Sequence, residues 1–140
     1  MSTIGKIFFD TAPFIYLLEN HPKYGQMVDD FIIDATANNA SFVTSILSLA
    51  EFGVVPERNT RQDLIADFEH LIRIASFEML PIERQIAIIS YKLRAKYPAL
   101  KALDSLQLAA AISSGCDHFF TNDYKLKRVQ EINVVIVDEL

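Results

Sequence analysis

The sequence predicts an α/β fold, a three-layer α/β/α sandwich with a mostly parallel central sheet. Short runs of consecutive apolar residues recur along the chain, and their length is typical of strands that are buried on both faces. Between these runs lie longer segments whose apolar residues recur at helical spacing. Strands that alternate with helices in this order form a parallel sheet that is covered on both sides.

Five segments are expected to be strands. The first, KIFFD, is a compact apolar run that ends at an aspartate, and the third, FEMLPI, ends at Pro81. The expected strands are residues 6–10, 41–45, 77–82, 118–121 and 133–137. They are separated by enough chain for a helix to cross from one to the next, as a parallel sheet requires.

Helices are expected between these strands. Thr11 is placed to cap the first, Gly115 is placed to end the segment before the fourth strand, and PERNT at 56–60 is a clear break. The expected helices are residues 11–20, 23–38, 46–55, 61–76, 83–96, 104–115 and 123–130. The segment 104–115 is apolar nearly all round, so we expect it to be buried.

Length and composition predict one globular domain, residues 1–140. Hydrophobic residues make up 51% of the chain and charged residues 22%, which excludes a disordered protein. No apolar run is long enough to span a bilayer, and the N-terminal end lacks the pattern of a signal peptide. Cys116 is the only cysteine, so no internal disulfide forms, which fits a cytoplasmic location.

The formal net charge of -5 argues against a protein that grips nucleic acid through a broad basic surface. Any role with nucleic acid must therefore rest on a local site, or on metal ions that reverse the local charge.

Four acids lie where such a local site would form. Asp10 ends the first strand, Asp123 follows the fourth, Glu51 lies in the helix after the second, and Asp104 opens the buried helix before the fourth. Ligands of parallel α/β sheets bind outside the carboxyl ends of the strands. We therefore expect these four side chains to converge at that edge.

Each acid taken alone also has a structural explanation. Asp10 and Asp123 are placed to cap helices, and Asp104 with Gln107 resembles a capping box. Together they fit that explanation less well, because Glu51 lies in an otherwise apolar helix where an unpaired carboxylate is costly. Carboxylates without histidine or cysteine partners suit a hard divalent cation such as Mg²⁺, and the three histidines are scattered along the chain.

Four segments of the chain resemble the signature segments of the PIN-domain nuclease family. They are FFDTAPFIYLLE, TSILSLAEF, LKALDSLQLAAA and FFTND, in this order and at ordinary spacing. The resemblance covers about residues 6–137, and the compact size is similar to that of the VapC-type toxins of toxin–antitoxin pairs. It implies one PIN-like domain. The family also includes housekeeping ribonucleases, and no motif in the chain separates the two.

The resemblance implies a metal-dependent endoribonuclease that cleaves RNA phosphodiester bonds with a metal-activated water. Asp10, Glu51, Asp104 and Asp123 would be both the catalytic acids and the ligands of one or two Mg²⁺ or Mn²⁺ ions. Thr121 would orient an acid or a water. It also implies a cognate antitoxin and a homodimer as partners. Ser45 and Asn122 are weaker candidates beside the site. Ser105 departs from the family pattern, since many members have alanine at this position.

Two further surfaces are candidates for partners. Arg94, Lys96 and Lys101 precede Asp104 and are placed either to guide the RNA backbone or to form a solvated helix end. Self-association is expected because a small domain has little interior for its many hydrophobic residues. The candidate contact surfaces are the 61–76 helix and the first helix, with Phe14, Tyr16, Leu17 and Leu18.

Two alternative functions stay open. The first is another Mg²⁺-dependent phosphate hydrolase with Asp10 as a covalent nucleophile, but such enzymes typically have a second aspartate at the position of Ala12. The second is a catalytically silent PIN-like scaffold or binding module. Such scaffolds usually lose an acid, and all four are present here.

Overall fold

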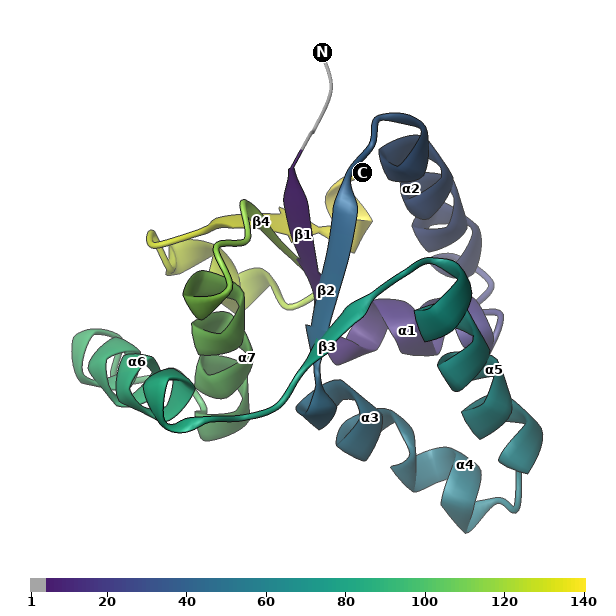
Figure 1. Ribbon diagram of the computed structural model, residues 1–140, viewed down its shortest axis with the longest axis horizontal. Helices are drawn as coiled ribbons and strands as arrows, with labels where there is room; N and C mark the ends of the chain where they lie inside the picture. The colour runs from purple at the N-terminus through teal and green to yellow at the C-terminus, as the bar shows by residue number, and fades with distance from the viewer. Residues whose placement is uncertain (1–4) are drawn as a thin grey trace.

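A computed structural model describes residues 5–140. Its five strands form one sheet in the order β3-β2-β1-β4-β5, and each neighbouring pair is parallel. The strands are β1 Lys6–Phe9, β2 Ser41–Ser45, β3 Glu78–Leu80, β4 His118–Thr121 and β5 Asn133–Ile136. The central pair, β1 and β4, are far apart in sequence and adjacent in the sheet (Figure 1).

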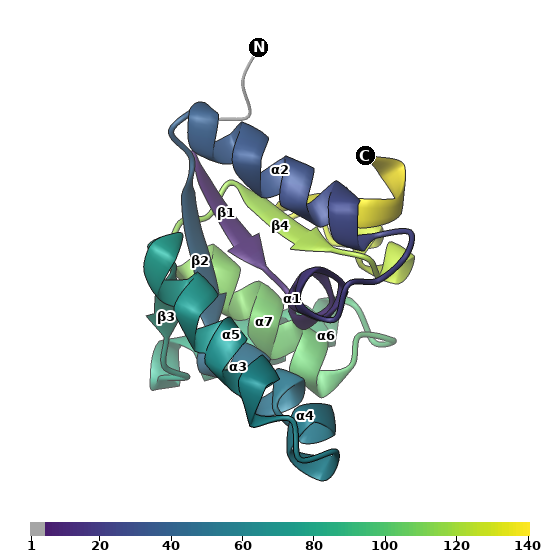
Figure 2. The same ribbon diagram turned by 90° about the vertical axis from the view of Figure 1, so that its right-hand side faces the viewer.

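Helices cover both faces of the sheet, which confirms the three-layer sandwich. The helices are α1 Thr11–Leu18, α2 Gly25–Ala37, α3 Ile46–Phe52, α4 Val54–Arg58, α5 Gln62–Ile74, α6 Arg84–Lys96 and α7 Ala102–Ser113, with the 3-10 helices η1 Tyr124–Arg128 and η2 Val137–Glu139. In Figure 1, α1, α2 and α5 lie on one side of the sheet and α6 and α7 on the other. Figure 2 shows the first group in front of the strands.

The two Phe-Phe pairs of the sequence explain how one sheet supports two cores. Successive side chains of a strand point to opposite faces, so each pair places one ring in each core. Phe8 and Phe119 stack with ring centroids 5.4 Å apart on the side of α6 and α7. Phe9 and Phe120 meet at 5.0 Å on the side of α1 and α2. These contacts fix the register of β1 against β4.

Several element boundaries differ from the prediction. The expected break at 56–60 is wrong for its first three residues, because Val54–Arg58 forms α4 and Pro56 lies in its first turn, where the missing N–H of proline costs no helical hydrogen bond. Asn59 and Thr60 form the turn that follows. Helix α7 begins two residues before Asp104, so this acid lies in the first turn. The segment after β4 is a 3-10 helix. Gly115 has a φ of 73° just past α7, as a residue that ends a helix does.

The structure also narrows the surfaces available to partners. Phe14 is only 1% exposed and belongs to the core, so the expectation that it contributes to a contact surface is wrong. Within residues 5–140, no helix is both long and apolar enough to cross a membrane. The expectation that the chain starts without a signal peptide falls partly on residues 1–4, which lie outside the described residues.

Candidate active site

Asp10 lies at the junction of β1 and α1. Its backbone N–H donates to the carbonyl of Phe120 (2.9 Å), which continues the pairing of β1 with β4 past the end of the strand. Its carboxylate Oδ1 accepts from the backbone N–H of Thr11 (2.9 Å) and caps α1. Of the two residues expected as the cap of this helix, Asp10 and not Thr11 is the cap, so the Thr11 hydroxyl is left for another partner.

Thr121, the last residue of β4, connects two of the acids. Its hydroxyl donates to Oδ2 of Asp10 (2.8 Å) and accepts from the backbone N–H of Asp123 (3.2 Å). The Oδ1 atom of Asp123 accepts from the backbone N–H of Lys125 (3.0 Å) and caps η1. One hydroxyl thus ties together segments that are more than 100 residues apart in the sequence.

Glu51 reaches the same place through Thr11. The Thr11 hydroxyl donates to Oε1 of Glu51 at 2.5 Å. The Glu51 side chain is exposed, so the expected cost of burying it in an apolar helix does not arise. This role of Thr11 could not be predicted from the sequence, because its position after Asp10 indicates only a helix cap.

Asp104 lies in the first turn of α7, and the buried Gln107 of the same helix joins α7 to its neighbours. This glutamine is 1% exposed, and it accepts from the Ser45 hydroxyl (2.5 Å) while its amide donates to the Ser48 hydroxyl (2.8 Å). The bonds join α7 to β2 and α3, so they fix where the first turn of α7 stands relative to the sheet. The predicted capping box of Asp104 and Gln107 is wrong, since this amide is committed to the two serines.

The acids act on one another electrostatically. Burial and, to a smaller extent, the charges of Asp104 and Glu51 raise the pKa of Asp10 to about 6, against the hydrogen bonds from Thr121 and Thr11, which lower it. Burial also raises the pKa of Asp104, as do the charges of Asp123 and then Glu51, while Lys101 opposes this rise. The carboxylates of four separate segments therefore share one electrostatic environment.

The donor chemistry of this cluster fits a hard divalent cation. Within residues 5–140, no group of three or more His, Cys, Asp or Glu side chains is arranged so that it could hold a metal ion on its own. Mg²⁺ commonly binds through one or two carboxylates and completes its shell with water and substrate phosphate oxygens, so it does not require such a group. All four candidate ligands are carboxylates, and Asp10 and Asp104 hold their charge at a cost that a cation would remove.

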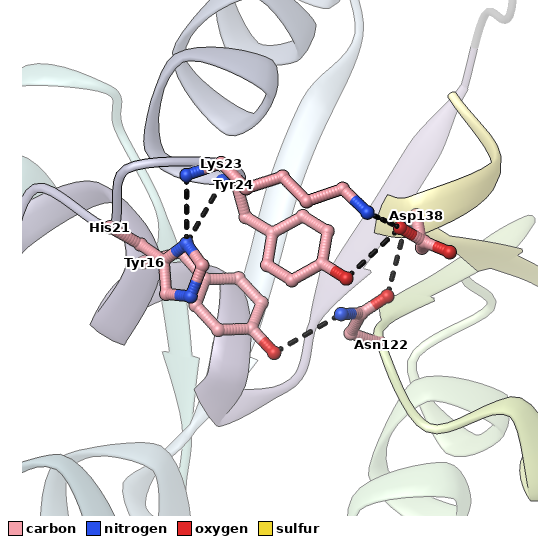
Figure 3. Close-up of polar contacts among 6 residues, drawn as sticks. All are labelled: Tyr16, His21, Lys23, Tyr24, Asn122 and Asp138. Carbon is pink, nitrogen blue, oxygen red and sulfur yellow. Dashed lines mark hydrogen bonds and ion pairs between the residues drawn. The ribbon is translucent and has the colours of Figure 1, made fainter.

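Asn122, between Thr121 and Asp123, is clamped by a second set of contacts (Figure 3). Its amide donates to the Tyr16 hydroxyl (3.1 Å), and its Oδ1 accepts from the backbone N–H of Asp138 (3.0 Å). The Asp138 carboxylate in turn accepts from the Tyr24 hydroxyl and pairs with Lys23, both at 2.9 Å. The loop that carries Asp123 is thus joined directly to α1 and η2, and through Asp138 to the connection between α1 and α2.

A family model for the PIN domain matches residues 7–132. The chain belongs to the PIN-domain family. No curated protein matches the sequence. The roles of Asp10, Glu51, Asp104, Asp123 and Thr121 in catalysis stay predictions.

Similar solved structures have the same fold over nearly their whole length. A toxin–antitoxin complex from Klebsiella pneumoniae has a TM-score of 0.71 at 20% identity, covering 94% of this chain and 97% of that one. VapBC2 from Rickettsia felis, bound to a DNA fragment from its promoter, has 0.75 at 16%, covering 94% and 98%. Mycobacterium tuberculosis VapC20, a Sarcin-Ricin loop cleaving toxin, has 0.67 at 14%, covering 91% and 98%. At these identities the likeness shows the fold alone.

Proposed function

We propose that this PIN-domain protein is a Mg²⁺- or Mn²⁺-dependent endoribonuclease, acting as a single PIN-like domain and as the toxin of a toxin–antitoxin pair. The observation that supports the nuclease most is the meeting of four acids, from four separate segments, in one electrostatic environment at the carboxyl edge of the sheet. Acids held together in this way are suited to divalent cations and phosphate oxygens.

The residues of the chain divide the work. Asp10 is held by donors on both of its oxygens, so its orientation is fixed before any ligand arrives. Thr121 positions Asp10 and the backbone of Asp123, and Thr11 positions Glu51. When bound, Mg²⁺ or Mn²⁺ would neutralise the acids, bind the scissile phosphate and lower the pKa of water.

The partners follow from the proposed activity and from the similar structures. The substrate is RNA, as one similar structure is that of a Sarcin-Ricin loop cleaving toxin. A cognate antitoxin protein is proposed because others are toxin–antitoxin complexes. We also propose a homodimer in the cytoplasm. Exposed Ile33 and Ile74, on α2 and α5, are apolar side chains that a protein partner would cover.

A catalytically silent binding module is the second candidate. The absence, within residues 5–140, of a ready group of three metal ligands favours it. The phosphatase alternative has no such support, since Ala12 stands where such enzymes typically have a second aspartate.

Cleavage of a labelled single-stranded RNA tests the proposal. The purified protein is expected to cut it with Mn²⁺ and to stop with EDTA. Asp10→Asn and Asp104→Asn are expected to lose activity about a hundredfold or more, since each removes a ligand of the cation. Asp67→Asn, at an exposed acid on α5, is the matched control and should keep full activity. Stoichiometric RNA binding without cleavage, unaffected by metal, would favour the silent module instead.

A further inference from the structure

A cavity of about 390 Å³ adjoins the acids and carries charges of both signs. It lies between the start of α7 and η1, and two residues of the acidic cluster, Asp104 and Asp123, line it. Three basic side chains line it too: Lys101, Lys125 and Arg128. The acids that the proposed chemistry uses therefore open directly onto a basic surface.

These three basic side chains have no partner within residues 5–140. The ion pairs there use Lys23, Arg61, Lys96 and Lys127, and the cavity residues form none. Their side chains also make no hydrogen bond to the described residues. The protein thus leaves three positive charges unpaired beside a cluster of acids.

The geometry of η1 determines which of its basic residues line the cavity. A 3-10 helix has three residues per turn, so side chains three apart lie on the same side. Lys125 and Arg128 are three residues apart and both line the cavity. Lys127 does not line it, and its Nζ pairs with Oε1 of Glu139 at 2.9 Å. Asp123 caps η1, so the position of this basic pair is coupled to that of the acid.

The other side of the cavity is formed by the start of α7. Lys101 precedes this helix and gives it no side-chain cap, so the first backbone N–H groups of a 12-residue helix are left for an anion. The Arg94 side chain donates to the carbonyl of Leu100 (3.3 Å) and supports this turn. Lys96 is paired with Glu131, so of the three basic residues first considered for RNA only Lys101 reaches the cavity.

We propose that this cavity binds the phosphate–ribose backbone of the RNA next to the scissile phosphate, with Lys101, Lys125 and Arg128 contacting the phosphates. This inference rests on the proposed ribonuclease function. Its volume is that of a small-ligand pocket and exceeds what one phosphate needs, and Leu100 and Leu126 give it an apolar part for a ribose. RNA is favoured over an acidic peptide as the ligand, because an RNA strand can extend from the basic side chains of the cavity to the acids that act on a phosphate.

Kinetics of RNA cleavage as a function of KCl concentration test this proposal. The variant Lys101→Gln/Lys125→Gln/Arg128→Gln is expected to raise KM roughly tenfold with kcat unchanged, because contacts away from the reacting bond bind substrate and transition state equally. Each phosphate contact on a single strand contributes about 0.7 to the slope of log(kcat/KM) against log[KCl]. Removing three contacts should therefore make this slope shallower by about 2. Each single variant should account for about 0.7 of this change.

The matched control removes the same charge elsewhere. Arg58, Arg84 and Lys92 are exposed, form no ion pair within residues 5–140 and do not line the cavity. Their triple glutamine variant should keep the wild-type KM and salt slope. Thermal melts of both variants check that the fold is retained, and the single variants carry the test if the cavity triple variant does not fold.

The outcomes separate the inference from the function on which it rests. Metal-dependent cleavage with unchanged KM and salt slope in the cavity variant would overturn the inference and leave the ribonuclease standing. Equal effects in the two triple variants would also overturn it, since net charge and not the cavity would then govern binding. Loss of antitoxin binding with unaltered RNA kinetics would assign the cavity to an acidic peptide. A wild-type protein that does not cleave RNA would remove both proposals.

Discussion

Replacing Asp10 with asparagine is expected to stabilise the metal-free protein at neutral pH. Burial, together with the charges of Asp104 and Glu51, raises the pKa of this carboxyl from 3.8 to about 6. A carboxyl whose pKa rises on folding costs stability above its unfolded pKa, because the fold must then hold the charged form that it disfavours. The rise from 3.8 to about 6 corresponds to a cost of about 3 kcal/mol at pH 7.5.

An opposing effect limits the gain. Asparagine has one carboxamide oxygen, so it cannot accept from both Thr11 and Thr121 as Asp10 does, and the lost hydrogen bond costs about 1 kcal/mol. The net gain at pH 7.5 is therefore about 2 kcal/mol, or about 6 °C in Tm for a chain of this length.

The gain should depend on pH in a defined direction. Between pH 3.8 and about 6, the folded wild type binds a proton at Asp10 that the unfolded chain has released, so its stability rises as the pH falls. The cost of the charge drops to about 1.6 kcal/mol at pH 5, which leaves the variant an advantage of about 0.6 kcal/mol. Near pH 4.5 the cost of the charge on Asp10 falls to about 1 kcal/mol, which equals the cost of the hydrogen bond that the variant loses. The two proteins should therefore be equally stable at that pH.

Thermal and urea unfolding in EDTA at pH 7.5, 6 and 5 measure this difference. Asp67→Asn, which removes an exposed charge on α5, should show no change in its difference from wild type across the same range. A variant Asp10→Asn that is less stable than wild type at pH 7.5, or whose advantage does not shrink on acidification, would show that the carboxylate is not held under electrostatic cost.

Three further outcomes are expected. Thr11→Val frees Glu51 and should lower kcat/KM for RNA about fivefold, the equivalent of about 1 kcal/mol, with the far-UV circular dichroism unchanged; full activity would remove Thr11 from the site. Gln107→Leu leaves the hydroxyls of Ser45 and Ser48 without their amide partner and should cost about 1–3 kcal/mol in urea unfolding; an unchanged midpoint would show that this network is dispensable. Mn²⁺ affinity, measured by calorimetry, should fall up to about tenfold per pH unit below pH 6, because the cation must displace a proton from Asp10, and a flat profile would separate Asp10 from the metal.

The fold followed from the sequence because its strongest signals are local. Buried parallel strands are short apolar runs, and the Phe-Phe pairs at 8–9 and 119–120 marked both strands of the central pair. The boundary errors lie where tertiary contacts override local propensity. Residues 56–60 look like a break, yet α4 packs between α3 and α5 and makes Pro56 a first-turn residue.

The positions of the four acids of the candidate site could be predicted from the sequence, but the hydrogen bonds that hold them could not. Asp10 and Asp123 were recognisable because they follow strands that a parallel sheet places side by side. The bonds of Thr11 to Glu51 and of Asn122 to Tyr16 join residues 40 and 106 positions apart, and no local pattern encodes such pairs. The unpaired basic residues of the cavity could not be predicted for the same reason, because a sequence does not show which lysines form ion pairs.

An anomalous difference map from crystals soaked in Mn²⁺ at neutral pH would locate the cation. We expect a peak at the carboxyl edge of the sheet, about 2.1 Å from carboxylate oxygens of at least two of the acids Asp10, Glu51, Asp104 and Asp123. Crystals that show no such peak at saturating Mn²⁺, or that hold the ion only at unrelated acids, would contradict the assignment of these residues as a metal-dependent nuclease site.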